Sequence, residues 1–77
     1  MINFSEEDRE RILAWYQGLG GDANASSSEK DVAHRLRGEQ GLDETDTRWV
    51  LYWAETSSGS DAELDLIRKL RKGVGLE

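Results

Sequence analysis

Apolar residues recur along the chain at helical spacing in three segments and form one continuous run in another. In the first segment they occupy positions 12, 15, 16 and 19. Intervals of three, four and seven residues place these side chains on one face of a helix. Ser5 can cap this helix, acidic residues follow in its first turn, and Gly18 and Gly20 can end it. The pattern predicts a helix over residues 5–18.

The second segment has a narrow apolar stripe between polar ends. Ser28 can cap a helix over residues 29–40. Gly41 can adopt the left-handed conformation that closes such a helix, with Leu42 folded back towards Leu36 in a Schellman ending. The apolar positions of this helix are Val32, Ala33 and Leu36.

The last segment predicts a helix over residues 60–72. Ser60 and Glu63 have the spacing of a capping box. Acidic residues lie near the start of the segment and basic residues near its end, which is the order that the helix dipole favours. The apolar positions repeat at intervals of three and four: Leu64, Ile67, Leu70 and Val74.

Between these segments, residues 49–54 read WVLYWA, a continuous apolar and aromatic run. Its residues have high strand propensity, but no second segment alternates in a way that would give a strand a partner. Asp43 before the run and Ser57 to Gly59 after it favour a helix over residues 44–57. Because such a helix is apolar nearly all round, we expect it at the centre of the fold.

These elements predict an all-α fold, a single small bundle of four short helices. The 77-residue chain is long enough for one domain, which we place at residues 1–75. We expect Leu76 and Glu77 to be the remnant of an expression tag.

The charge balance narrows the range of partners. The formal net charge is −6, which disfavours nucleic acid and anionic membranes as partners because both attract basic surfaces. There is no cysteine, and no apolar run approaches the roughly 20 residues that a membrane-spanning helix needs. We therefore expect a cytoplasmic protein without a membrane segment.

The sequence offers little catalytic or metal-binding chemistry. His34 is the single histidine, with no nucleophile evident beside it. Asp22 begins a stretch that resembles a calcium loop, but Ser27 and Ala33 stand where that loop needs Gly and Glu. We therefore predict no catalytic residue, no metal site and no cofactor, and a protein that is not an enzyme.

The aromatic run allows a functional interpretation beside its role in the core. One ring, most naturally Tyr52 or Trp53, can be partly exposed as an anchor for a partner. The basic patch of the last helix, with Arg68 and Arg71, can meet an acidic partner or simply complement the helix dipole. These four residues are the candidate partner contacts. They predict a non-catalytic, small acidic protein-interaction or regulatory module, whose unidentified protein partner could be a second copy in a homodimer.

The alternative is a DNA-binding regulator of the helix-turn-helix type. The helices at 29–40 and 44–57, with Gly41 between them, have the outline of that motif, and Arg48 lies on its second helix. Its departures from the motif are a polar Thr47 at a position normally aliphatic, Arg37 at a position normally small, and acidic Glu44 and Asp46 at the start of the second helix.

Overall fold

Four α-helices make up most of the structure, so the prediction of a small all-α bundle is confirmed. The computed structural model describes residues 2–57 and 64–75. Within these ranges there is no strand, only an isolated antiparallel bridge between Ile2 and Leu42. The elements are α1 (Glu6–Gly18), the short 3-10 helix η1 (Gly21–Ala23), α2 (Ser27–Arg37), α3 (Glu44–Ser57) and α4 (Leu64–Gly73).

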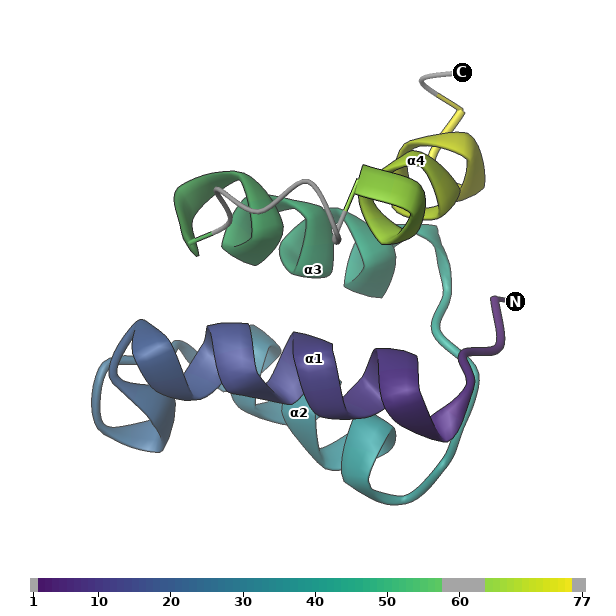
Figure 1. Ribbon diagram of the computed structural model, residues 1–77. Helices are drawn as coiled ribbons and strands as arrows, with labels where there is room; N and C mark the ends of the chain where they lie inside the picture. The colour runs from purple at the N-terminus through teal and green to yellow at the C-terminus, as the bar shows by residue number, and fades with distance from the viewer. Residues whose placement is uncertain (1, 58–63, 76–77) are drawn as a thin grey trace.

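Helix α3 is the centre of the bundle. Figure 1 shows α1 and α2 side by side, α3 lying over them, and α4 crossing α3 steeply on its other side. Because α3 contacts all three other helices, its apolar run is shared among three neighbours. The buried hydrophobic side chains on α3 are Val50, Leu51, Trp53 and Ala54.

The indole of Trp53 is fully buried and also makes a polar contact. Its ring lies 4.9 Å from that of Tyr16 on α1, and its Nε1 donates a hydrogen bond of 2.9 Å to Glu29 Oε2 on α2. Partial burial tends to raise the pKa of Glu29, but hydrogen bonds from Trp53 and Ser26 outweigh it and hold that pKa below its usual value. Trp53 thus joins α1, α2 and α3 at one point.

Tyr16 is held at its hydroxyl as well as at its ring. The hydroxyl donates a hydrogen bond to Asp22 Oδ1 in η1. Burial, followed by this hydrogen bond and the charge of Asp22, raises the pKa of Tyr16 to about 12. The glycine-rich loop after α1 is therefore tied to the core, and Gly20, with φ of 112°, supplies the left-handed turn that the loop needs.

Helix α2 begins two residues earlier than predicted, and its cap is Ser26 rather than Ser28. Ser26 accepts a hydrogen bond from Glu29 N, and Glu29 Oε1 in turn accepts one from Ser26 N. This reciprocal pair is a capping box. The sequence contains three consecutive serines, and Ser26 is the one that has a glutamate three positions later.

The end of α2 was also wrongly placed, because the Schellman ending forms before Gly41. Gln40 N donates to Arg35 O and Glu39 N donates to Leu36 O, the paired bonds of that motif. Glu39 takes the left-handed position, with φ of 60°. Leu42 is instead paired with Ile2 through two backbone hydrogen bonds and is fully buried.

The start of α3 lies where it was predicted, and it is organised by polar groups. Asp43 Oδ1 accepts a hydrogen bond from Asp46 N, which caps the helix. Asp46 is buried and accepts two hydrogen bonds of 2.8 Å from Arg35 Nη1 on α2. Thr47 is buried too, and its hydroxyl donates to Asp43 O. The first turn of α3 is therefore fixed to α2 by an ion pair in which Asp46 is buried and Arg35 is partly exposed.

Helix α4 packs on α3 through Leu66 and Leu70 and is tied to the N-terminal segment by Lys69. The ammonium group of Lys69 donates to Asn3 O and lies 5.0 Å from the centre of the Phe4 ring. The predicted first residues of this helix, with the Ser60–Glu63 capping box, lie outside the described residues. In the described ranges, no helix is long and apolar enough to cross a membrane.

Candidate interaction surface

A groove lies between the outer face of α3 and the end of α4. Its volume is about 300 Å³. Leu51 and Val74, both almost buried, supply its aliphatic lining, and Tyr52 stands beside them. The complete lining is Arg48, Leu51, Tyr52, Glu55 and Val74. We call it the α3–α4 groove.

Tyr52 is the most exposed part of the aromatic run. Its side chain is 57% exposed, whereas Trp53, the next residue, is fully buried. The Tyr52 ring meets the half-buried Trp49 edge to face, with ring centres 6.3 Å apart. An aromatic pair therefore stands at the surface beside the aliphatic lining of the groove.

Charged side chains of both signs form the rim. Arg48 makes an ion pair of 2.9 Å with Glu44 one turn earlier, and Glu55 lies 3.8 Å from Arg71 of α4. All four side chains are more than one third exposed. Such exposed pairs contribute little to stability, so these groups can exchange partners at low cost.

The structure separates the four residues predicted as partner contacts. Tyr52 is at the groove, and Arg71 reaches the rim through Glu55. Trp53 lies in the core, so its ring is not available at the surface. Arg68 is exposed on α4 but does not line the groove. Whether Tyr52, Arg68 and Arg71 contact a partner stays a prediction.

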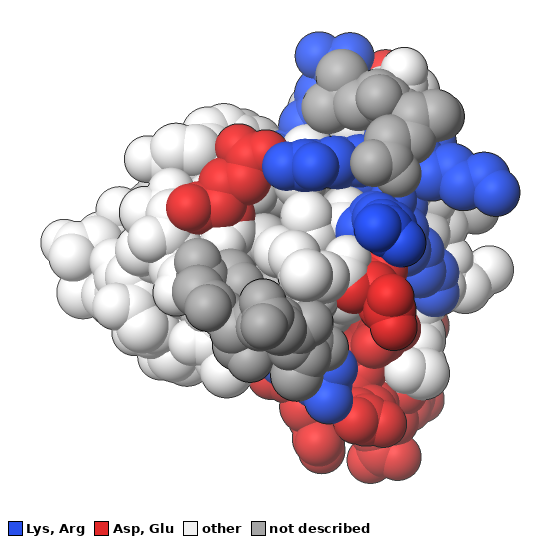
Figure 2. All heavy atoms as spheres, turned by 45° about the horizontal axis from the view of Figure 1, so that its top comes forward, with Lys and Arg blue, Asp and Glu red and all other residues white. Residues whose placement is uncertain are grey.

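Figure 2 shows basic side chains gathered in the upper part of the view, with acidic side chains against the edges of this area and a further acidic group at the bottom. The basic patch of α4 comprises Arg68, Lys69, Arg71 and Lys72, all exposed. Lys69 is also engaged with the N-terminal segment, since its ammonium lies 3.8 Å from Asp8. Arg71 reaches the rim of the α3–α4 groove through its ion pair with Glu55, and Arg68 and Lys72 are exposed to solvent.

Sequence reasoning missed the groove as a unit. Arg48, Leu51, Tyr52 and Glu55 follow one another at i, i+3, i+4 and i+7, the spacing of a single helix face. The continuous apolar run hides this face, because a helix that is apolar nearly all round does not show which side is exposed. The contribution of Val74 depends on how α4 crosses α3, for which the sequence carries no signal.

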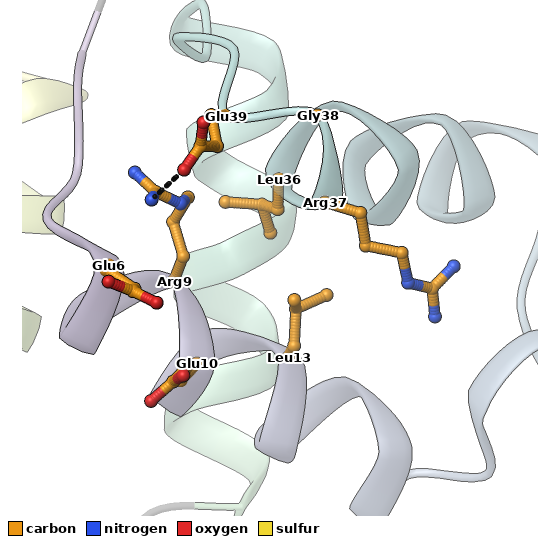
Figure 3. Close-up of a pocket in the computed structure, with 8 residues that line it drawn as sticks. All are labelled: Glu6, Arg9, Glu10, Leu13, Leu36, Arg37, Gly38 and Glu39. Carbon is orange, nitrogen blue, oxygen red and sulfur yellow. Dashed lines mark hydrogen bonds and ion pairs between the residues drawn. The ribbon is translucent and has the colours of Figure 1, made fainter.

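A second, larger depression lies between α1 and the end of α2, with a volume of about 510 Å³ (Figure 3). Leu13 and Leu36 are its apolar residues, and the rest of its lining is charged residues and Gly38. Figure 3 shows Arg9 turned towards Glu39, to which it is paired at 3.0 Å, while Arg37 points away from them. Without an aromatic side chain, this depression is a poorer anchor site than the α3–α4 groove.

The residues considered for other chemistry have structural roles or are exposed. Asp22 accepts from Tyr16, and Ser26 caps α2. His34 is exposed on α2. Within residues 2–57 and 64–75, no three His, Cys, Asp or Glu side chains are grouped so that they could hold a metal ion.

Comparison of the chain with protein-family models, with curated proteins and with solved structures gives no match.

Proposed function

We propose that this protein is a small, non-catalytic protein-interaction module whose contact surface is the α3–α4 groove. The observation that carries the proposal is the exposure of Tyr52 beside an aliphatic groove. A domain of this size has few large apolar side chains with which to build a core. A tyrosine left 57% exposed on the central helix adds little to that core.

The composition of the groove supports the proposal. Interfaces between proteins commonly place aromatic and arginine side chains over an apolar centre with a polar rim. Here Tyr52 and Arg48 stand beside Leu51 and Val74. Leu64 is the other large hydrophobic residue that is exposed among the described residues, but it does not line the groove.

The DNA-binding alternative has weaker support. Six residues, 38–43, separate α2 from α3, whereas a helix-turn-helix uses a turn of three or four. Arg48 is paired with Glu44, whose exposed carboxylate at the start of α3 would repel phosphate.

The test is affinity capture from an extract of the source organism, with and without nuclease, using three forms of the chain. Tyr52→Ser removes the anchor, and Leu64→Ser is the matched control because it removes a similarly exposed apolar side chain outside the groove. We expect the parent and Leu64→Ser to retain the same protein after nuclease treatment, and Tyr52→Ser to lose it. Recovery that depends on nucleic acid, or that is equal for all three forms, would contradict the proposal.

A further inference from the structure

We infer that the α3–α4 groove binds a second copy of this chain, with the two α3 helices antiparallel across a two-fold axis. The inference rests on the proposed function, because it names the partner of the same surface. It follows from the arrangement of charge and apolar side chains on the outer face of α3.

The outer face of α3 is narrow and continuous. Arg48, Leu51, Tyr52 and Glu55 occupy it in that order over two turns. Val50, Trp53 and Ala54 point to the opposite side, where they are buried. Arg48, Tyr52 and Glu55 are therefore available to a partner, and the buried Leu51 forms the apolar floor between them.

This face is complementary to itself. Arg48 and Glu55 lie equally far along the helix from the midpoint between Leu51 and Tyr52. When two identical helices pair antiparallel about that midpoint, Arg48 of each copy faces Glu55 of the other. The same operation places Tyr52 of each copy over Leu51 of the other, which lies in the groove. One symmetry axis thus satisfies two ion pairs and two apolar contacts.

The local charge permits this approach even though the chain is acidic. Arg48 and Arg71 balance Glu44 and Glu55 around the groove, so the rim carries no net charge. Most of the net charge of −6 comes from residues 1–43, which do not line this face and contain nine acidic and five basic residues. At physiological salt, charges more than about 8 Å apart are largely screened.

The exposed side chains at the rim can also change partners. Arg48 is 65% exposed and Glu55 is 54% exposed, so their present ion pairs are open to solvent. Replacing such a pair by one across an interface costs little. Because a face of two helical turns is small, we expect association in the micromolar range or weaker.

The experiment uses charge reversal and mixing, followed by sedimentation equilibrium from low micromolar to about 1 mM protein. Arg48→Glu places two carboxylates opposite each other at both ends of the interface, and Glu55→Arg places two guanidinium groups there. We expect each single variant to self-associate at least about tenfold more weakly than the parent. A mixture of the two variants should form a heterodimer, and the double variant R48E/E55R should self-associate like the parent.

Each variant has a control with the same change of charge on another helix. Lys30→Glu on α2 matches Arg48→Glu, and Glu10→Arg on α1 matches Glu55→Arg. Both controls should self-associate like the parent. The mixing arm separates pairing between chains from effects within one chain, because a loss of stability in either variant would not be reversed by the other. Circular dichroism checks that every variant is folded.

The inference is overturned if the parent stays monomeric up to about 1 mM, or if the mixture fails to form a heterodimer while the parent dimerises. The proposed function is tested separately. If a monomeric chain captures a different protein in a Tyr52-dependent way, the proposed function stands. Only the inference that the partner is a second copy of this chain is then refuted. Dimerisation that survives both charge reversals and Tyr52→Ser would use another surface and would overturn the inference, while the capture experiment would still decide the proposed function.

Discussion

The two faces of α3 differ sharply in burial, although neighbouring residues form them. On the inner face, Trp53 is fully buried, packs at a tilt against the Tyr16 ring and donates a hydrogen bond to Glu29. On the outer face, Tyr52 is 57% exposed and lines a groove with a charged rim. A single aromatic run therefore supplies both the centre of the core and the candidate interaction surface.

The difference shows how a small domain can divide one helix between stability and binding. The inner side chains belong to the buried core at which α3 meets the other helices, so their loss affects the whole bundle. The outer side chains contact mainly their own helix and the end of α4. Mutations on the two faces should consequently separate the unfolding free energy from partner binding.

The largest effect is expected from Trp53→Ala. Removing a buried tryptophan costs about 3–5 kcal/mol, and a domain of this size has a net stability of roughly 5 kcal/mol. We expect this variant to be unfolded or nearly so. Trp49→Ala should cost less, because Trp49 is half buried. Thermal melts followed by circular dichroism test both, and a cooperative melt of Trp53→Ala at the parent temperature would refute the central role of the inner face.

The next largest effect concerns the Tyr16 hydroxyl, which extends the inner face to η1. Because the folded pKa of about 12 lies above the ordinary value of 10, an unfolded chain ionises first as the pH rises. Folding stability should therefore be intact below pH 10 and fall between pH 10 and 12, by about 2–3 kcal/mol at about 1.4 kcal/mol per pKa unit.

Urea unfolding at several pH values measures this decline, and Tyr16→Phe is its control. The variant lacks the ionisable group, so its stability should fall less steeply over the same range. Equal slopes for the parent and for Tyr16→Phe would show that the hydroxyl is not held as the structure places it.

A smaller loss of stability is expected at the cap of α2, which is linked to the inner face of α3 through Glu29. Ser26 and Trp53 both bind the Glu29 carboxylate, so the cap and the inner face share one group. Ser26→Ala should cost about 1 kcal/mol, the usual contribution of such a cap. Ser28→Ala, at the position predicted from the sequence, should change the unfolding free energy by less than about 0.5 kcal/mol. Urea unfolding of both variants decides between the two serines, and equal losses would contradict the assignment.

Much of the fold was predictable because helical spacing and caps act locally. Ser5 and the glycines of the following loop placed α1, and Asp43 placed the start of α3. The errors occurred at α2, where competing signals lie within two residues of each other. Three serines could cap the helix, and the left-handed position fell on Glu39 although two glycines stand nearby.

The candidate site was predictable only in part. The sequence pointed to the aromatic run, but the residue types alone do not show whether Tyr52 or Trp53 is the exposed one. That exposure depends on which sides of α3 are covered by α1, α2 and α4. It is a property of the tertiary packing and not of the local sequence. The groove needs Val74, whose position depends on the crossing of α3 by α4.

The most direct test of the division of α3 into two faces measures stability and self-association on one variant, Tyr52→Ser. The account predicts an unfolding free energy within about 0.5 kcal/mol of the parent value, together with a loss of dimer in sedimentation equilibrium. A large loss of stability would mean that Tyr52 belongs to the core. Unchanged association of a stable variant would mean that the outer face of α3 is not the surface through which this protein binds a second copy.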